Sequence, residues 1–287
     1  MEHLEHAVQS TAQSNEAITL MLVGGGIRFP AFVGALRAIE EKNLRIGKLI
    51  GTSTGSIVGA LYSDGMTPSE LQQETMAIDP SRFRDQSLTS LVGRYGLCRG
   101  DALESWLDGR LHQRRFADSG RWPLQIVATD MRHYRPVTFS AETTPDISVA
   151  TAARASAGVP WVFGYRQLAY RGKEYALVDG SLMAGVVERN LPREERTLIL
   201  KVVSKRTLHR PGSGSLTFRK YFVEMLSFFL HSQEKEFIKG GKWKDTILLY
   251  CADIPPTQFS LNEDEKTYLM EQGYEQTMKY LEYKWGI

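Results

Sequence analysis

Short apolar runs alternate with amphipathic segments along most of this chain, and the two patterns predict different elements. Continuous apolar runs predict buried strands, whereas apolar residues three or four positions apart predict helices that pack on one face. The predicted strands are Ile18–Val23, Lys48–Ile50, Leu124–Asp130, Val137–Ser140, Tyr175–Val178, Thr197–Val203 and Ile247–Tyr250. Helices are expected over Ile57–Tyr62 and from about Pro30, Thr67, Asp101, Ile147, Phe218 and Ser260. This alternation favours an α/β fold with a mostly parallel central sheet.

The segment from Asp79 to Gly100 fits neither pattern, because it mixes proline and glycine with four arginines. Long loops of this kind are often lids or binding loops, and a tolerated surface insertion is the equally supported alternative. Residues 1–17 have little to bury and are expected to form a poorly ordered arm. Since no composition shift marks a linker after them, residues 18–287 are expected to form one domain.

The composition narrows the choice of function. Of 287 residues, 42% are hydrophobic and 24% are charged, which are ordinary values for a globular protein. The formal net charge of +2 creates no strong field toward nucleic acid, so no nucleic-acid partner is expected. Cys98 and Cys251 lie far apart and form no metal-binding spacing.

The distribution of apolar residues also bears on location. The sequence contains no window of about 18 apolar residues, so we expect no membrane-spanning helix. The amino terminus lacks the apolar core of a signal peptide, and two separated cysteines suit a reducing compartment. We therefore expect a cytoplasmic protein whose membrane contact, if any, is peripheral.

A strand, a one-residue turn and a helix follow one another without a loop around Ser53. The sequence there is Gly51-Thr-Ser53-Thr-Gly55. In such an elbow the apex residue is strained, and small neighbours such as Gly51 and Gly55 let the surrounding backbone approach. The serine hydroxyl then projects at the sheet edge, with the positive end of a helix behind it. A glycine-rich turn that matches by chance is the alternative, and the flanking strand and helix favour a nucleophile.

The run Gly24-Gly25-Gly26 follows the first predicted strand and offers backbone N–H groups that can converge on an oxyanion. A nucleotide-binding loop is less well supported. A dinucleotide fingerprint needs glycine at position 29, where Phe29 stands, and no Gly-Lys-Ser/Thr follows for a phosphate-binding loop.

A carboxylate is the expected base for the serine. None of the six histidines follows a predicted strand inside a glycine-rich turn. Asp179 ends a predicted strand and is followed by Gly180, so its side chain is expected at the same sheet edge as Ser53. Asp130 ends another strand and competes with it, and its alternative role is a structural turn residue.

Three ordered motifs, Gly24-Gly-Gly-Ile-Arg28, Gly51-Thr-Ser-Thr-Gly55 and Asp179-Gly180, together resemble the patatin-like phospholipase family. Further likeness at Val127–Asp130, Arg154–Pro160 and Glu263–Lys266 extends the resemblance from about residue 18 to the end. It implies a three-layer α/β/α sandwich and a Ser-Asp dyad that acts on lipid acyl esters without histidine, cofactor or metal. The residues so implied are the nucleophile Ser53, the base Asp179, an oxyanion hole at Gly24, Gly25, Gly26, Ile27 and Arg28, and the supporting glycines Gly51, Gly55 and Gly180.

Two positions depart from the family pattern. Phe29 stands where glycine usually follows the basic residue, and Ser181 stands where the third motif usually ends in glycine or alanine. We expect Phe29 to narrow the slot that binds the acyl chain or to make it more apolar. We expect Ser181 to hydrogen-bond the Asp179 carboxylate. Neither change removes a catalytic group.

The expected function is cleavage of phospholipid or lysophospholipid esters through an acyl-enzyme on Ser53. The alternatives are an acyltransferase or thioesterase that uses the same dyad, and a non-catalytic regulatory module that keeps the fold. The partner expected in each enzymatic case is an acyl-ester substrate, and the oligomeric state stays open.

Two features of the sequence are candidates for peripheral contact with a membrane. One is the apolar stripe of the expected helix at Phe218–Ile238, for which a buried core or interface position is the favoured interpretation. The other is a spread of arginines, which more often forms a solvated face. These arginines are Arg94, Arg99, Arg110, Arg114, Arg115 and Arg121.

Overall fold

The computed structural model describes residues 16–203, 217, 221, 224–225, 228, 243–251, 254, 258 and 260–287. Its strands are β1 (Ile18–Val23), β2 (Ile46–Thr52), β3 (Gly96–Cys98), β4 (Leu124–Asp130), β5 (Arg135–Phe139), β6 (Trp161–Phe163), β7 (Arg166–Tyr170), β8 (Lys173–Val178), β9 (Thr197–Val203) and β10 (Thr246–Tyr250). Its α-helices are α2 (Pro30–Glu41), α3 (Thr54–Asp64), α4 (Pro68–Ala77), α5 (Leu88–Gly93), α6 (Asp101–Arg110), α7 (Val149–Ser156), α8 (Ala184–Arg189) and α10 (Glu263–Tyr280). Shorter turns are η1 (Gly26–Arg28), η2 (Pro80–Phe83), η3 (Gly180–Met183), η4 (Trp243–Asp245) and the π-helical η5 (Leu281–Trp285).

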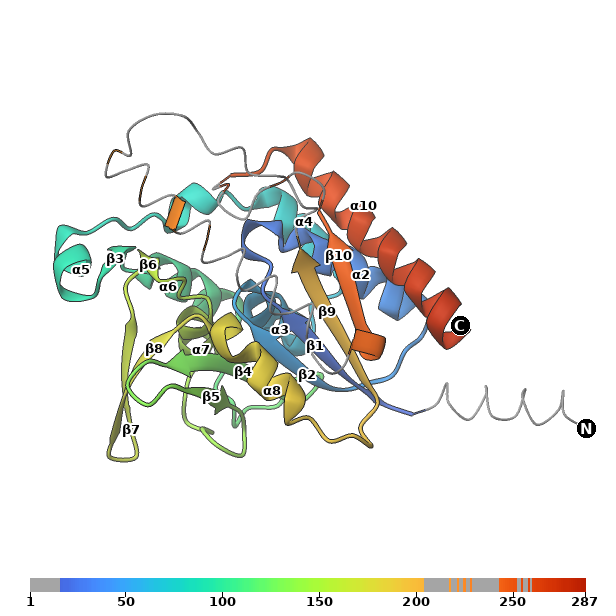
Figure 1. Cartoon of the computed structure of the whole chain (residues 1–287), viewed down its shortest axis with the longest axis horizontal. Coiled ribbons are helices and arrows are strands. Elements are labelled where there is room, and N and C mark those ends of the chain that lie inside the picture. Colours follow the sequence, from blue (N-terminus) through green and yellow to red (C-terminus); the bar gives the residue numbers. More distant parts are fainter. Residues whose placement is uncertain are drawn as a thin grey trace, which may run out of the picture.

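A mixed sheet crosses the centre of the molecule (Figure 1). Its strand order is β10-β9-β1-β2-β4-β8-β7, and β5 also pairs with β4. The strands from β10 to β4 run parallel, with β1 between β9 and β2. β5 and β8 pair antiparallel with β4, and β7 pairs antiparallel with β8. The sheet is therefore parallel through its centre and antiparallel at one side.

Alternate residues of the strands face apolar clusters on the two sides of the sheet. Leu20 and Leu22 of β1 pack in the larger cluster, to which α2, α3, α7 and α10 contribute. Met21 and Val23 pack in the smaller cluster with Ala184 of α8. The division follows from the two-residue period of a strand. Helices thus flank both faces, and the expected α/β fold with a mostly parallel central sheet is confirmed.

α2 and α10 lie side by side over the larger cluster (Figure 1). Their contact depends on two glycines. A Cβ on Gly34 would lie 1.7 Å from the carbonyl oxygen of Met270, and one on Gly273 would lie 1.9 Å from that of Ala31. Without side chains at these points the two backbones touch directly.

The segment expected to be irregular, Asp79–Gly100, contains η2, α5 and β3. β3 pairs in parallel with β6, joining Gly96 to Trp161 and Cys98 to Phe163. Neither β6 nor β7 was predicted. β6 has three residues and a partner far along the chain, so it leaves no local periodicity, whereas the five residues of β7 form a hairpin with β8.

The last helix also begins differently from the expectation. Asn262, not Ser260, is its N-cap, and Asn262 and Glu265 exchange hydrogen bonds between side chain and backbone at 2.8 Å each. The expected helix at 218–238 lies outside the described residues apart from isolated positions, as does the arm except at residues 16 and 17. Among the helices described, none has the length and apolar character needed to cross a membrane.

Candidate active site

Ser53 occupies the turn between β2 and α3. Its φ of 54° and ψ of −136° are a backbone conformation that side-chain-bearing residues rarely adopt, at a cost of about 1–3 kcal/mol. The surrounding backbone leaves no room for larger neighbours. A Cβ on Gly51 would lie 2.5 Å from Cα of Ser56, and one on Gly55 would lie 2.5 Å from the carbonyl oxygen of Leu22. The elbow expected from the sequence is therefore present, and its glycines permit close packing.

The Ser53 hydroxyl donates a hydrogen bond to Asp179. Oγ of Ser53 lies 2.7 Å from Oδ2 of Asp179, and each residue is only 4% exposed. A serine hydroxyl held against a buried carboxylate can lose its proton to that carboxylate, which is the arrangement a nucleophile and its base require.

The strand register explains how the two residues meet. β4 lies between β2 and β8, with Thr52 of β2 opposite Val127 and Val178 of β8 opposite Thr129. Ser53 follows Thr52, and Asp179 follows Val178. Both residues therefore lie level with Ala128 of β4. β8 runs antiparallel to β2, and the two ends meet because β8 pairs only with the last part of β4.

Asp179 is fixed by three hydrogen bonds besides the one from Ser53. Its Oδ1 accepts from the N–H of Ser181 at 2.8 Å, its own N–H donates to the carbonyl of Gly158 at 3.0 Å, and its carbonyl accepts from Oγ1 of Thr129 at 2.8 Å. A Cβ on Gly180 would lie 1.9 Å from the carbonyl oxygen of Val127, so the residue after Asp179 must be glycine.

Ser181 contacts the carboxylate through its backbone. Asp179 caps η3 with its side chain, so the hydrogen bond from Ser181 to Asp179 comes from the backbone N–H and not from the hydroxyl that distinguishes serine from glycine or alanine. The buried Ser181 hydroxyl forms no hydrogen bond to any atom in the described ranges. Any small residue at position 181 would supply the same N–H donor.

Burial changes the acidity of Asp179. Removal from water raises the pKa of this carboxyl to about 6, and the hydrogen bonds from Ser53 and Ser181 oppose the rise. A carboxylate with this pKa is a stronger base than an exposed aspartate and still ionised at neutral pH.

The glycine run beside Ser53 is held by hydrogen bonds to its own carbonyls. The carbonyl of Gly24 accepts from the N–H of Gly55 at 3.1 Å and from Oγ1 of Thr54 at 2.9 Å. The carbonyl of Gly25 accepts from the N–H of Arg28 at 3.0 Å and from its Nε at 3.4 Å. Because N–H and C=O point in opposite directions across a trans peptide, the N–H groups of Gly25 and Gly26 are oriented as well.

The amides of the five candidate oxyanion residues differ in their partners. The N–H of Gly24 donates to Oγ1 of Thr52 at 3.2 Å, and that of Arg28 donates to Gly25. Those of Gly25, Gly26 and Ile27 meet no acceptor within the part of the chain that the structure describes. These three amides are the donors that remain for a ligand oxygen.

Arg28 and Phe29 join the glycine run to α2. Arg28 is only 3% exposed, and its side chain holds the Gly25 carbonyl. Phe29 has a φ of −51°, an ordinary helical value that does not require glycine, and its side chain packs against the larger core cluster. The aromatic residue therefore fits at position 29 without strain.

Ser156 is a residue of this site to which sequence analysis assigned no role. Its Oγ accepts from the N–H of Ser53 at 2.9 Å and donates to the carbonyl of Val127 at 2.5 Å. It thereby ties the elbow to β4. A lone serine within the alanine-rich segment of α7 was the available signal, and only the spatial arrangement gives it meaning.

Asp130 has other partners. Its carboxylate accepts from the N–H of Arg132 at 3.1 Å and lies 2.6 Å from Nδ1 of His133, with Nε of Arg135 at 3.9 Å. These contacts hold the β4–β5 turn. No group of three or more metal-binding side chains that could hold an ion occurs among the described residues.

Comparison with known proteins gives this geometry a context. A family model described as patatin-like phospholipase matches residues 20–195. The chain is 25% identical over 278 residues to the uncharacterized protein YqhO of Bacillus subtilis, covering 90% of this chain and 96% of that one. It is 27% identical over 179 residues to the probable lipid hydrolase 463L of Invertebrate iridescent virus 6, covering 57% of this chain and 59% of the viral protein.

A solved structure shares the fold. VipD from Legionella pneumophila superimposes with a TM-score of 0.63 at 16% identity, over 94% of this chain and 67% of that chain. At this identity the likeness concerns architecture alone. The family model, by contrast, matches more than half of the sequence and includes the glycine run, the elbow and Asp179, so the chain belongs to the patatin-like phospholipase family.

Proposed function

We propose that this protein is a serine lipid acyl hydrolase that cleaves carboxylic ester bonds of phospholipids or lysophospholipids. The observation that carries the proposal is the 2.7 Å hydrogen bond from Oγ of Ser53 to Oδ2 of Asp179 at a strained, buried elbow. The name of the viral relative, a probable lipid hydrolase, supports the same class of reaction.

In the first half of the reaction, Asp179 takes the hydroxyl proton while Oγ of Ser53 attacks the ester carbonyl carbon. The developing oxyanion accepts hydrogen bonds from the N–H groups of Gly25 and Gly26, beside the positive end of α3. Collapse of the tetrahedral intermediate breaks the bond to the alcohol oxygen, which leaves with the proton from Asp179. The acyl group stays on Ser53.

In the second half, water replaces the alcohol. Asp179 takes a proton from the water as its oxygen attacks the acyl carbon, and the proton returns to Oγ when the fatty acid leaves. Oxyanion donors of this kind supply about 3–4 kcal/mol of transition-state stabilisation. The remaining acceleration comes from the fixed geometry of the nucleophile and from the raised pKa of the base.

The test combines active-site labelling with product analysis. A fluorophosphonate probe is expected to label Ser53, and mass spectrometry of a mixed lipid extract is expected to show released fatty acids. Ser53→Ala and Asp179→Asn are each expected to reduce product formation by at least about 10³-fold while circular dichroism shows a folded protein.

Asp130→Asn is the matched control, because Asp130 is also a buried carboxylate at the end of a strand that borders the site. It is expected to keep its turnover. An active Asp179→Asn beside an inactive, folded Asp130→Asn would overturn the assignment of the base. No labelling of Ser53 would favour a non-catalytic binding module.

A second candidate function is acyl transfer to an acceptor other than water. It is favoured by the 4% exposure of Ser53 and Asp179, since a site that excludes water slows hydrolysis of an acyl-enzyme. Adding an alcohol, a lysolipid or a thiol acceptor distinguishes the two, because a transferase forms the new ester or thioester faster than free fatty acid.

A further inference from the structure

An apolar helix face is exposed at the periphery of the molecule. Leu88, Leu91 and Val92 of α5 follow the i, i+3, i+4 spacing that normally marks the buried side of a helix, and Tyr95 lies two residues beyond the end of α5. Here they are 81%, 41%, 77% and 69% exposed, and Leu97 of β3 adds another residue at 40%. We call these five residues the α5 face. In Figure 1, α5 and β3 lie at the far left end of the molecule, away from the C-terminus.

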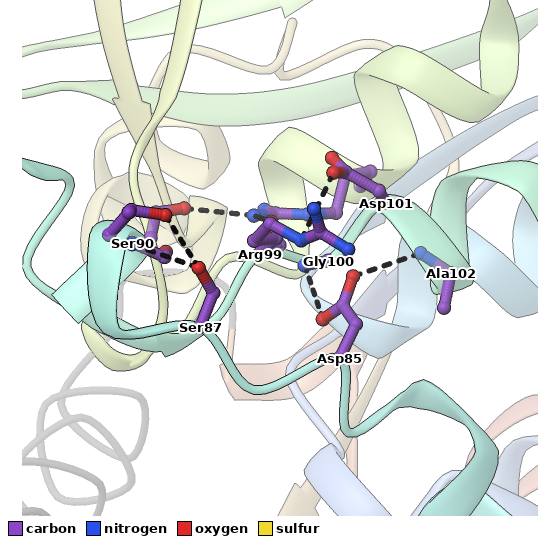
Figure 2. A network of polar contacts seen from close by, with 10 residues as sticks. Asp85, Ser87, Ser90, Arg99, Gly100, Asp101 and Ala102 are labelled. Carbon is purple, nitrogen blue, oxygen red and sulfur yellow. Dashed lines mark hydrogen bonds and ion pairs between the residues drawn. The ribbon is translucent and has the colours of Figure 1, made fainter.

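The base under the α5 face is firmly anchored. Oδ1 of Asp85 accepts from the N–H of Gly100 at 2.8 Å, and Oδ2 accepts from that of Ala102 at 3.1 Å (Figure 2). On the other side, the buried Arg154 donates from Nη2 to the carbonyls of Arg99 at 2.5 Å and Gly164 at 2.8 Å. The exposed side chains therefore stand on a fixed backbone.

Arginines outnumber carboxylates around the α5 face. Residues 79–101 contain four arginines and three aspartates, and of these aspartates Asp79 and Asp101 are exposed at the two ends of the segment. Both carboxylate oxygens of the third, Asp85, turn inward to backbone N–H groups, as Figure 2 shows. The four arginines, by contrast, are all exposed, and Arg99 lies 3.6 Å from Asp101 at the edge of the segment. These arginines are Arg82, Arg84, Arg94 and Arg99.

The α5 face connects directly to the dyad. β3 pairs with β6, whose first residue, Trp161, is 37% exposed beside it. Three residues before Trp161, the carbonyl of Gly158 accepts the N–H of Asp179. The α5 face is thus linked to Asp179 by the pairing of β3 with β6 and by the hydrogen bond from Asp179 to Gly158, which lies just before β6.

We propose that the α5 face docks into the surface of an anionic lipid bilayer. Leu88, Val92 and their neighbours would enter the acyl boundary while the arginines contact anionic headgroups, which is the pattern of an interfacial helix. An apolar face with a cationic rim matches anionic headgroups above hydrocarbon. The proposal rests on the proposed function, since docking here would present lipid esters to Ser53.

The first experiment is flotation with vesicles of phosphatidylcholine that contain phosphatidylglycerol, compared with phosphatidylcholine alone. The wild type is expected to float with the anionic vesicles and to be released by raised salt. Leu88→Asp and Val92→Asp are each expected to weaken partition about tenfold or more. Tyr283→Asp is the matched control, because Tyr283 is 82% exposed in η5, outside the α5 face, and this variant should float like the wild type.

Replacement of Arg82 or Arg94 by glutamine is expected to lower partition on the order of fivefold and to reduce its salt dependence. Equal flotation of wild type and Leu88→Asp, or flotation that does not depend on phosphatidylglycerol, overturns the proposal. So does a wild-type dimer in sedimentation equilibrium that Leu88→Asp dissociates, because the α5 face would then bind a second copy of the chain.

A soluble ester separates this proposal from the catalytic one. Leu88→Asp is expected to hydrolyse p-nitrophenyl butyrate like the wild type and to lose activity on vesicles, whereas Ser53→Ala is expected to float normally and hydrolyse neither. If the wild type leaves the soluble ester intact but floats, the catalytic proposal fails and docking stands. If it hydrolyses the soluble ester but does not float, docking fails alone.

Discussion

The backbone of Ser53 carries strain that its side chain cannot relieve. A φ of 54° with a ψ of −136° is accessible to glycine, whereas any Cβ is crowded there. Strain of this kind is often found where a reactive group must project from the fold. At Ser53 it accompanies a hydroxyl that is already hydrogen-bonded to its acceptor.

Relief of this strain can be measured. Ser53→Gly is expected to be more stable to urea than Ser53→Ala by about 1–2 kcal/mol, although glycine ordinarily destabilises a protein relative to alanine. Both variants lack the hydroxyl, so lost hydrogen bonds cancel in the comparison. An alanine variant as stable as the glycine variant would show that the elbow imposes no strain.

Asp179 links catalysis and stability to pH in opposite directions. It acts as a base only when ionised, so the rate of acylation should rise with pH through about 6, the pKa of the buried carboxyl. In the unfolded chain an aspartate titrates near 3.9. Between these values the folded protein binds more protons than the unfolded one, and its stability falls as pH rises.

Asp179→Asn should therefore be inactive and more stable than the wild type. At pH 8 the expected gain is on the order of 2–3 kcal/mol, and it should fall to a few tenths of a kcal/mol near pH 3.5, where both states of the wild type are mostly protonated. Urea unfolding of both proteins across this range measures the difference. A gain that stays undiminished at pH 3.5 would indicate a packing effect of the amide instead of removal of a buried charge.

At the scale of elements, the contact between α2 and α10 shows how two glycines define a helix pair. Each glycine lies against a backbone carbonyl of the other helix, so the helices approach more closely than side chains normally allow. This fixes α2, and with it the preceding loop that contains Gly25 and Arg28.

Gly273→Ala is expected to destabilise the protein by roughly 3 kcal/mol, because its Cβ would lie 1.9 Å from the carbonyl oxygen of Ala31. Gly59→Ala in α3 is the matched control. A Cβ there would lie 3.8 Å from its nearest neighbour, so the better helix propensity of alanine should raise stability by about 0.5–1 kcal/mol. Thermal unfolding of the two variants should shift in opposite directions, and parallel shifts would contradict the close contact.

Elements with a strong local pattern could be predicted from the sequence. β4 and β9 have the same ends as the apolar runs Leu124–Asp130 and Thr197–Val203, because a strand buried on both faces is a continuous apolar segment. α5 and β3 could not be predicted, since their short backbone is fixed by Asp85, Arg154 and pairing with β6. Tertiary contacts of this kind have no signature in local periodicity.

At the scale of the whole molecule, the sequence predicted the members of the candidate site better than their arrangement. Ser53 and Asp179 were each identified at the end of a strand, yet their meeting depends on an antiparallel β8 that overlaps only the end of β4. Strand order and direction arise from the packing of distant segments. Ser156 accepts a hydrogen bond from Ser53, and Thr129 donates one to Asp179. These roles can be recognised only after the strand order is known.

The second face of the sheet is joined to its helix by a buried ion pair. Nζ of Lys201 in β9 donates to Oε2 of Glu188 in α8 at 2.8 Å, with side chains 1% and 4% exposed. Burial raises the pKa of the Glu188 carboxyl, and Lys201 opposes this rise. Such a pair contributes little net stability over apolar residues, but each charge becomes costly when the other is removed.

A double-mutant cycle tests this connection between layers. Lys201→Met is expected to cost about 3–5 kcal/mol in urea unfolding at pH 7, because Glu188 then stays buried without its cation or must take up a proton. Lys201→Met combined with Glu188→Leu should return close to wild-type stability, which gives a coupling energy of several kcal/mol. Additive losses would mean that α8 is held by packing around Ala184 and Val187, with the two charges acting independently of each other.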